Sequence, residues 1–315
     1  MPLLSIADLY TSYPTSGGVL HAVDGVSFHV EQGETVGLVG ESGCGKSTLA
    51  KTILRLVPHT RGRILFDGID VSSLAPEPLR ILRRRMQMIF QDPFSSLNPR
   101  QSIGEILTSP LLVHGVGSRA ARDRAAEMIE QVGLPRTVLN HYPHEFSGGQ
   151  RQRIGIARAL VLRPEFVVCD EPVSALDLSI QAQILNLLAA MKREFNLSYL
   201  FVSHDLSVVR YFTDRVLVMY LGRIVESAGS RDLWRMPRHP YTRALMAAVP
   251  DPARRRQAAP LPGDLPSATK VPPGCRFHPR CPLATEICIV HDPALREVAS
   301  GHQVACHHAD HQPPH

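Results

Sequence analysis

The feature that most constrains this chain is a second glycine-rich helix start, which lies between a phosphate-binding loop and an acidic strand end. The helix start is Ser147-Gly-Gly-Gln-Arg-Gln-Arg153, the loop spans 40–47, and the acidic pair is Asp170-Glu171. Glycine-rich helix starts bind anions, because backbone N–H groups and the positive end of the helix point at the ligand. A second anion site that cannot serve its own loop implies a nucleotide shared between two subunits.

The first of these motifs is Gly40-Glu-Ser-Gly-Cys-Gly-Lys-Ser47, which fits the pattern G-x-x-x-x-G-K-[ST]. A buried strand is predicted before it at Thr35–Val39 and a helix after it at Lys46–Leu56. Lys46 is expected to reach the β- and γ-phosphates of a nucleotide, and the Ser47 hydroxyl to bind Mg²⁺. The expected nucleotide contacts are Gly40, Ser42, Gly43, Cys44, Gly45, Lys46, Ser47 and Thr48.

Cys44 lies in this loop at the predicted start of a helix. A thiol in that position tends to have a lowered pKa. We therefore expect Cys44 to react with alkylating reagents and to be protected by a nucleotide bound at the loop, whereas Cys169 is expected to lie in the core.

Strand-like and helix-like segments alternate from residue 1 to about 250 and predict an α/β fold with a mainly parallel sheet. Short apolar runs predict buried strands, and a break at Gly115-Val-Gly117 divides a helical stretch over 103–133. The predicted strands are Met86–Phe90, Phe166–Cys169, Tyr199–Val202 and a pair within Arg215–Ile224 that turns at Gly222.

Two further segments follow this α/β region. A proline-rich linker is predicted over 251–274 and a Cys- and His-rich extension over 275–315. No apolar run reaches the roughly 18–20 residues that cross a bilayer, and the first residues, MPLLSIADLY, lack the pattern of a signal peptide. We therefore expect a chain that stays in the cytosol, with its six cysteines reduced or metal-bound.

The acidic pair follows the apolar strand Phe166–Cys169. Phosphoryl-transfer sites need a carboxylate beside Mg²⁺, and Asp170 is placed for that role. Glu171, one residue further on, is placed to polarise an attacking water molecule.

With these motifs in this order over 1–225, the chain resembles the nucleotide-binding subunits of ABC transporters. The resemblance implies a P-loop NTPase (RecA-like) core in a domain of residues 1–250, with an antiparallel β subdomain and a helical subdomain at about 96–164. Ser174–Asp177 matches the D-loop, and Tyr13 is the candidate for stacking on adenine. The implied catalytic residues are Glu171, His204, Gln91 and Lys46, and the implied Mg²⁺ ligands are Ser47, Gln91 and Asp170.

The resemblance also implies how the second glycine-rich helix start works. In this family two subunits meet head to tail, so that each ATP lies between the phosphate loop of one subunit and the signature helix of the other. Ser147, Gly149 and Gln150 would then contact the ATP of the opposite subunit, in trans, and stabilise charge in the transition state. Phe146 stands where leucine is commonest, outside the glycines that contact phosphate.

Several stretches resemble the dipeptide and oligopeptide importers more narrowly. They are Gln91–Arg100, Tyr142–Arg153, Pro237–Leu245 and the tail that begins Pro272-Pro-Gly-Cys275. This resemblance implies an ATPase at the cytoplasmic face of the cell membrane that drives uptake of dipeptides or oligopeptides. The implied partners are a second ABC ATPase, more often a different chain than a second copy, two transmembrane permease subunits and an extracytoplasmic substrate-binding protein, with no nucleic acid.

Two alternative functions fit the sequence less well. A soluble ABC ATPase that acts on nucleic acid or ribosomes usually carries a coiled-coil insertion, zinc modules or two cassettes, and none is evident in the sequence. A regulatory module without hydrolysis is disfavoured by the presence of Lys46, Asp170, Glu171 and His204. The sequence does not encode the cargo, since dipeptides, longer peptides, murein peptides, nickel chelates and some sugars are moved by systems with this kind of ATPase.

The extension contains four cysteines, Cys275, Cys281, Cys288 and Cys306. Four thiolates in a short segment with many prolines suggest a metal site that stabilises it, although the spacing is not that of a CxxC zinc site. The resemblance implies a [4Fe–4S] cluster, for which four thiolates are suitable ligands. Zn²⁺ and thiols without a metal remain the alternatives.

Overall fold

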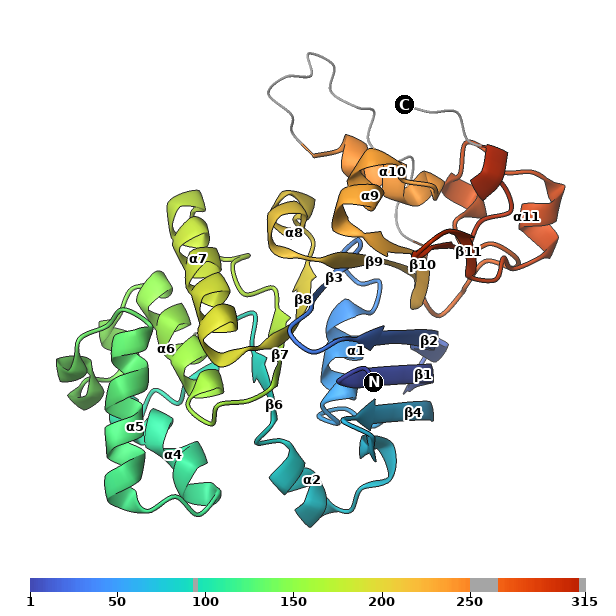
Figure 1. The fold of residues 1–315 in the computed structure, drawn as a ribbon. Helices are drawn as coiled ribbons and strands as arrows, with labels where there is room; N and C mark the ends of the chain where they lie inside the picture. Colours follow the sequence, from blue (N-terminus) through green and yellow to red (C-terminus); the bar gives the residue numbers. More distant parts are fainter. Residues whose placement is uncertain (93–95, 250–265, 312–315) are drawn as a thin grey trace. The chain divides into compact units, whose positions relative to one another are not determined.

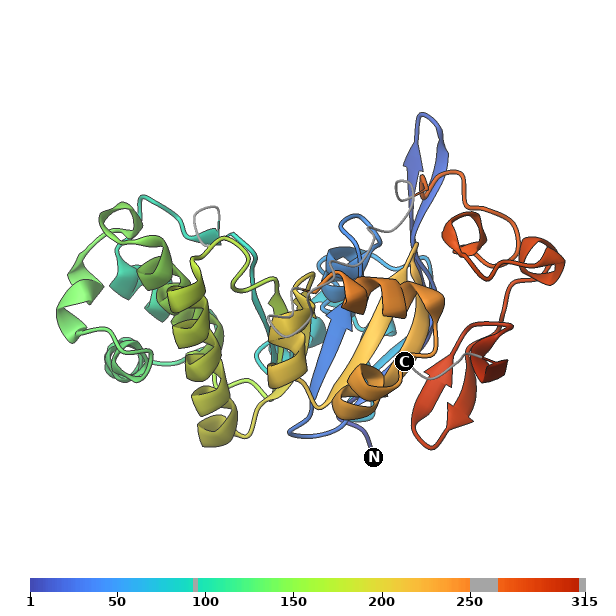
Figure 2. The ribbon, with the colours of Figure 1, turned by 90° about the horizontal axis from the view of Figure 1, so that it is seen from above.

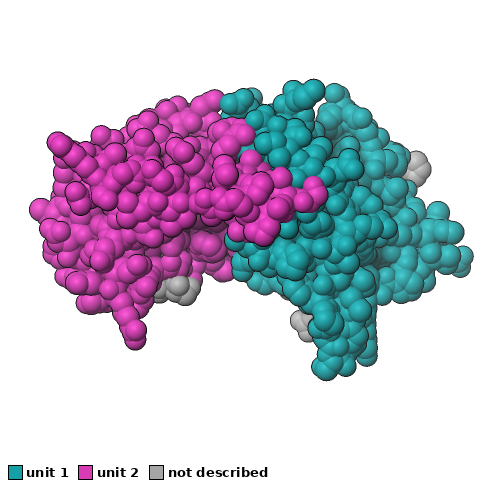
Figure 3. All heavy atoms as spheres, turned by 90° about the horizontal axis from the view of Figure 1, so that it is seen from below, with its two compact units in different colours: residues 1–72, 201–315 teal, residues 73–200 magenta. Residues whose placement is uncertain are grey.

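The computed structural model describes residues 1–92, 96–249 and 266–311. The chain forms two compact units, one of residues 1–72 and 201–315 and the other of residues 73–200 (Figure 3). The chain returns from the second unit to the first within strand β8, Ser198–Ser203. Most of the predicted linker, residues 251–265, lies outside the described residues.

The first unit begins with an antiparallel sheet of four strands in the order β2-β1-β4-β5 (Figure 1). Its long hairpin pairs β1 with β2, and the turn between them stands out from the rest of the unit (Figure 2). Buried and exposed residues alternate along β2 near Val26, as expected of strands with one face on a core. The strands are β1 (Leu4–Thr15), β2 (Gly18–Val30), β4 (Arg61–Phe66) and β5 (Ile69–Asp70).

A second set of strands in the same unit contains the strand before the phosphate loop. β3 pairs in parallel with β9, β9 forms an antiparallel hairpin with β10, and the hairpin turns at Leu221-Gly222 as predicted. All five residues of β3 are buried, which agrees with its uninterrupted apolar sequence. The strands are β3 (Thr35–Val39), β9 (Arg215–Tyr220) and β10 (Arg223–Gly229).

Short helices surround these strands. α1 follows the phosphate loop, α8 follows β8, and α9 and α10 lie over the β9–β10 hairpin (Figure 2). Their bounds are α1 (Lys46–Ile53), α8 (Leu206–Phe212), α9 (Ser230–Arg235) and α10 (Pro240–Ala247).

The second unit joins two parallel strands to a group of helices (Figure 1). The predicted helical stretch is confirmed as α4 and α5, which are separated at Gly115-Val-Gly117. The elements are α2 (Pro76–Leu82), β6 (Met86–Ile89), α4 (Ile103–Val113), α5 (Ser118–Gln131), α6 (Gly148–Leu160), β7 (Phe166–Asp170) and α7 (Leu178–Phe195). The predicted combination of a parallel α/β part, an antiparallel sheet and a helical part is confirmed.

The Cys-rich extension is part of the first unit. Its hairpin of β11 (Arg296–Ala299) and β12 (His302–Val304) continues the sheet, because β12 pairs with β10. Helix α11 (Glu286–Val290) precedes the hairpin. Val304, Cys306 and Ala309 of the extension form a small buried cluster.

A buried carboxylate connects the extension to α10. Glu226 of β10 is fully buried and accepts hydrogen bonds from the backbone of Arg238 and His239, at 2.6 and 2.9 Å, and from Nε2 of His302 at 2.8 Å. A buried charge needs such partners, since an unpaired one would cost several kcal/mol, on the order of 3–5.

No helix of the described residues is long and apolar enough to cross a membrane.

His239 starts α10 in its neutral form. Its Nδ1 accepts the N–H of Tyr241 at 3.0 Å, so that this nitrogen carries no proton. Burial lowers the pKa of His239 to about 4, against the effect of nearby Glu226 and of a hydrogen bond to the backbone of Ala305. The ordinary value of 6.5 applies in the unfolded chain, which therefore binds more protons between pH 4 and 6.5.

We expect acidification to destabilise the protein through His239. Stability should rise with pH from about 4 to 6.5, and the loss at about pH 5 should be on the order of 2 kcal/mol. The measurement is the free energy of unfolding from denaturant titrations across this range. The control is His239→Asn, whose side-chain oxygen can accept the Tyr241 N–H without titrating. An equally steep pH dependence in that variant would contradict the assignment.

Candidate nucleotide-binding site

The phosphate loop, residues 40–47, connects β3 to α1 in the first unit. At Gly45 the backbone has φ of +109°, a conformation that favours glycine. A Cβ atom at this position would lie 2.0 Å from the carbonyl oxygen of Ala22 on β2. The loop therefore needs glycine here because it passes directly against a neighbouring strand. Ser47 and Thr48 lie in the first turn of α1.

Lys46 is buried, with 4% of its surface exposed. Its Nζ donates hydrogen bonds to the carbonyl oxygens of Gly40 at 2.7 Å and Glu41 at 2.9 Å, and lies 3.9 Å from Sγ of Cys44. Backbone carbonyls of the loop thus compensate the buried ammonium group. This arrangement places a positive charge inside the loop, where a phosphate group would enter.

The prediction that Cys44 has a lowered pKa and reacts readily is wrong, whereas its predicted contact with a nucleotide stays a prediction. Only 1% of its surface is exposed, and burial raises the pKa of its thiol although the charge of Lys46 acts in the opposite direction. Both the burial and the pKa make the thiol unreactive, so the loop geometry outweighs the effect of the helix N-terminus. Cys169 is fully buried, as predicted, and burial raises its pKa.

In the second unit the structure brings Gln91 and Glu171 together. The side-chain Nε2 of Gln91 donates to Oε2 of Glu171 at 3.0 Å. Gln91 follows β6 and Glu171 follows β7, and these strands pair in parallel, so both residues leave the same edge of the sheet. Asp170 and Glu171 are 3% and 8% exposed, and Glu171 has a positive φ of 47°.

The glycine-rich helix start is the N-terminus of α6. Ser147 caps this helix together with Gln150: Oγ of Ser147 accepts the N–H of Gln150 at 3.4 Å, and Oε1 of Gln150 accepts the N–H of Ser147 at 3.0 Å. Both residues are exposed. Gly149 packs against α7, where a Cβ atom would lie 2.7 Å from Cγ2 of Ile180. The glycine thus allows two helices to approach closely at the exposed end of α6.

The remaining nucleotide candidates lie in the first unit. Tyr13 is half-buried in β1, opposite Leu20 of β2. His204 is exposed and follows β8 directly, as the sequence predicts. The next residue, Asp205, caps α8 through the N–H of Ser207 at 2.8 Å.

The four thiols of the extension influence one another electrostatically. Burial raises the pKa of Cys275 to about 11, and the nearby charges of Cys306 and Cys288 contribute in the same direction. Sγ of Cys288 lies 3.6 Å from Nε2 of His308. Burial likewise raises the pKa of Cys306 to about 11 and that of Cys281. In the described part of the chain, however, no three Cys, His, Asp or Glu side chains form a group that could bind a metal ion.

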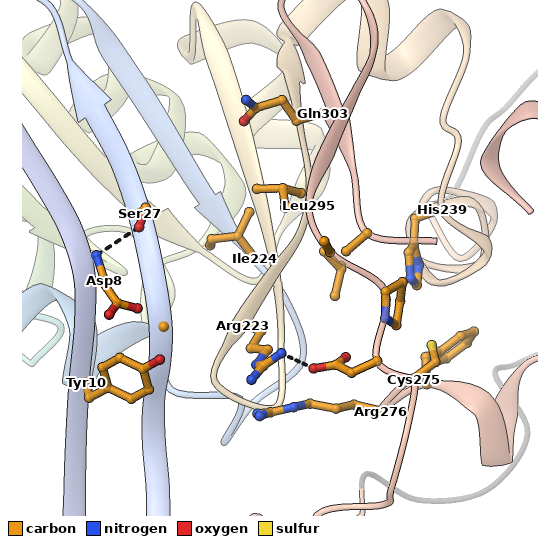
Figure 4. A pocket seen from close by; sticks show the side chains of 17 residues that line it. Asp8, Tyr10, Ser27, Arg223, Ile224, His239, Cys275, Arg276, Leu295 and Gln303 are labelled. Atoms are coloured by element: carbon orange, nitrogen blue, oxygen red, sulfur yellow. Dashed lines mark hydrogen bonds and ion pairs between the residues drawn. The ribbon is translucent and has the colours of Figure 1, made fainter. Parts of the chain in front are cut away.

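A cavity of about 470 Å³ also lies in the first unit, away from the phosphate loop (Figure 4). Two arginines line it, and both are paired: Arg223 with Asp292, and Arg276 with Asp24. In the figure a dashed line runs from the labelled Arg223 to its carboxylate partner. Of the residues predicted to bind a ligand, only Cys275 lines this cavity. It is therefore not the predicted nucleotide site.

Sequence reasoning missed the residues that support the phosphate loop from the C-terminal third of the chain. The N–H of Glu41 donates to the hydroxyl oxygen of Tyr241 at 2.8 Å. The carboxylate of Glu41 accepts two hydrogen bonds from Arg280, at 2.7 and 2.9 Å. The only sequence signal was that Tyr241 lies in the stretch Pro237–Leu245, which resembled peptide importers.

Comparisons with known proteins agree with these features. Residues 23–174 match the family described as ABC transporter, and residues 225–288 match the oligopeptide/dipeptide transporter C-terminal region. A Brucella ovis protein described as a putative peptide import ATP-binding protein is 55% identical over 308 residues, 97% of each chain. The oligopeptide transport ATP-binding protein AppF of Bacillus subtilis is 50% identical over 318 residues, again 97% of each chain.

Solved structures show the same fold. The ATP-binding cassette MJ0796, solved as a dimer in a post-hydrolysis state with ADP and Pi, is 30% identical and has a TM-score of 0.67. The match covers 72% of this chain and 99% of that one. The cbiO1 protein of Clostridium perfringens, part of an ABC transporter complex, is 27% identical with a TM-score of 0.66, over 74% and 90% of the two chains. This chain therefore belongs to the ABC transporter family, as one of its P-loop ATP-binding proteins with the oligopeptide/dipeptide transporter C-terminal region.

Proposed function

We propose that this chain is the ATP-hydrolysing subunit of an importer that takes up dipeptides or oligopeptides across the cytoplasmic membrane. As a member of the ABC family it is an ATPase. The observation that carries the proposal is that relatives named for peptide import match 97% of the chain at 50–55% identity, the C-terminal region included. The paired Gln91 and Glu171 and the loop that surrounds Lys46 supply the chemistry that such a function needs.

The substrate is ATP with its Mg²⁺ ion. Backbone N–H groups of residues 42–48 would bind the phosphates, and Lys46 would exchange its carbonyl partners for β- and γ-phosphate oxygens. Ser47, Gln91 and Asp170 offer only oxygen donors toward the ion, the donor type that Mg²⁺ prefers when phosphates complete its shell. Tyr13 would stack on adenine.

Hydrolysis would use Glu171 as the general base. Its carboxylate accepts a proton from water as the water oxygen attacks the γ-phosphorus, and the bond to the β-phosphate oxygen breaks to leave ADP. The hydrogen bond from Gln91 holds the carboxylate of Glu171 in place for this role. His204 would contact the γ-phosphate and stabilise charge in the transition state.

The opposite subunit would complete each site. Ser147, Gly149 and Gln150 stand at the exposed N-terminus of α6, whose backbone N–H groups suit a phosphate in trans. The dimeric post-hydrolysis structure of MJ0796 supports this arrangement. Because the side chain of Gln150 accepts the N–H of Ser147, Gln150 would act by holding the N-terminus of α6 in its conformation.

Glu171→Gln is expected to retain ATP binding and to lose turnover by about two to four orders of magnitude, because the amide cannot accept a proton. The measurement is steady-state release of phosphate beside equilibrium binding of ATP. The matched control is Glu194→Gln on α7, an exposed carboxylate bonded to Gln131 at 2.8 Å, which should leave both quantities unchanged. Near-normal hydrolysis by Glu171→Gln would refute the assignment.

The proposed partners are two permease subunits, a second ABC ATPase that is a different chain, and an extracytoplasmic substrate-binding protein. The chain would sit peripherally on the cytoplasmic face of the membrane, with the segment after Gln91 toward the permeases. Its family membership supports the permeases, and the C-terminal region supports the peptide branch.

Purification of the chain from native membranes under gentle, anaerobic conditions should recover these partners. We expect mass spectrometry to identify two permeases, a second ATPase and a substrate-binding protein in comparable amounts. Recovery of nucleic acid or ribosomal proteins without a membrane protein would instead favour a soluble ABC ATPase. Recovery of this chain as the only ATPase beside the permeases would show that the working dimer is a homodimer and not a heterodimer.

We further propose that the extension binds a [4Fe–4S] cluster through Cys275, Cys281, Cys288 and Cys306, with Zn²⁺ as the alternative. The cysteines affect one another's pKa electrostatically, which supports the proposal. As they stand in this structure, they do not form a ready metal-binding group. The cluster would serve the stability of the extension, because four thiolates gain from a shared cation.

Anaerobically purified protein is expected to contain about four iron atoms and four acid-labile sulfides per chain, with visible charge-transfer absorption. Cys288→Ser should remove the absorption and lower the melting temperature, whereas Cys169→Ser in the core should leave the absorption in place. One equivalent of zinc without iron would decide for Zn²⁺. Metal-free protein of undiminished stability would exclude both.

A further inference from the structure

Glu41, the second residue of the phosphate loop, connects Lys46 to the C-terminal third of the chain. Its carbonyl oxygen accepts a hydrogen bond from Nζ of Lys46 at 2.9 Å, and its N–H donates to the hydroxyl of Tyr241 at 2.8 Å. Its carboxylate accepts hydrogen bonds from both Nη1 and Nη2 of Arg280. Every polar group of Glu41 therefore has a partner, and two of these partners lie about 200 residues or more away in the sequence.

The Arg280–Glu41 pair differs from an ordinary surface ion pair. The side chain of Arg280 is 6% exposed and that of Glu41 is 25% exposed. Two parallel hydrogen bonds between a guanidinium and a carboxylate fix both groups in one geometry. The hydrogen bonds to Glu41 raise the pKa of Arg280, so the guanidinium remains charged. Breaking the pair would leave the nearly buried guanidinium without its partner, which is unfavourable.

An aromatic cluster fixes the side chains that contact Glu41. The rings of Tyr220, Tyr241 and Phe277 are fully buried, with centroids 4.7 to 5.5 Å apart. The guanidinium of Arg280 lies 6.0 Å from the centre of the Tyr220 ring. Arg280 itself ends a short 3₁₀ turn, His278–Arg280, that follows Phe277 in the extension. Packing thus determines where Arg280 can place its guanidinium.

A second contact runs through the turn between β9 and β10. The N–H of Gly222 donates to the carbonyl oxygen of Cys44 at 2.8 Å. The carbonyl of Leu221, the preceding residue, accepts a hydrogen bond from the buried guanidinium of Arg276. The extension therefore supports the phosphate loop near its beginning, through Arg280, and near its middle, through Arg276 and the turn.

We propose that Arg280 is a positioning residue for ATP binding, which acts through Glu41 to fix the first turn of the phosphate loop. The proposal rests on the ATPase function proposed above. The physical reason is preorganisation: a loop that already has its bound conformation does not lose ordering entropy when the phosphates enter. The C-terminal extension is then part of the ATP site's support and not only a module attached to the cassette.

The test compares the full-length wild type with Arg280→Ala, Arg280→Lys and Arg296→Ala, by equilibrium binding of Mg-ATP and by steady-state hydrolysis. Arg280→Ala should raise the Kd and KM for ATP about 10-fold, within the usual range for coupled sites, with kcat little changed. Arg280→Lys keeps the charge without the two parallel bonds and should lie between. Arg296→Ala is the control, because it breaks an exposed ion pair with Asp310 inside the same extension.

The split between KM and kcat separates positioning from general destabilisation. A purely structural role would reduce the active fraction, and hence the apparent kcat, at an unchanged KM. If Arg280→Ala does not fold, hydrogen exchange of residues 40–47 in Arg280→Lys decides: faster exchange there than in Arg296→Ala supports the proposal, and equal exchange overturns it. A Kd within twofold of the wild type in Arg280→Ala also overturns it. Wild-type protein that binds no ATP would instead refute the proposed function.

Discussion

The buried charge of Lys46 sets the main requirement of the phosphate loop. An ammonium group removed from water needs hydrogen-bond acceptors, and the carbonyl oxygens of Gly40 and Glu41 supply them. These carbonyls can serve only if the loop has one conformation, which Gly45 permits by its positive φ and its close approach to Ala22. The loop's conformation depends in turn on Glu41, whose partners Tyr241 and Arg280 come from the other end of the chain.

The C-terminal extension belongs physically to the unit that carries the loop. It adds β12 to the edge of β10, and His302 pairs with the buried carboxylate of Glu226. The same carboxylate accepts a hydrogen bond from the N–H of His239. His239 in turn caps the N-terminus of α10, because its Nδ1 accepts the N–H of Tyr241. The stretch Pro237–Leu245, which resembled peptide importers in sequence, therefore has a structural role, because it places the Tyr241 hydroxyl at the phosphate loop.

Local patterns in the sequence were sufficient for much of the fold. The strands predicted at Thr35–Val39 and Phe166–Cys169 are present, and the α4–α5 boundary lies at two glycines, as predicted. Gln91 and Glu171 were predicted to share one site, and their pairing follows from parallel strands that end at the same edge. The reactivity of Cys44 was predicted wrongly, because its burial depends on how the loop packs and not on its position before a helix.

The amino-acid sequence by itself determined the phosphate loop, the acidic strand end, the capped glycine-rich helix and the family, because each of these depends on residues close together in the chain. Only the tertiary structure decided what supports the loop. The Arg280–Glu41 pair joins residues 239 positions apart, and neither residue belongs to a recognisable pattern with the other. Such a contact exists only after β9, β10 and the extension have packed around Tyr241 and Phe277, since that packing brings the two charges together.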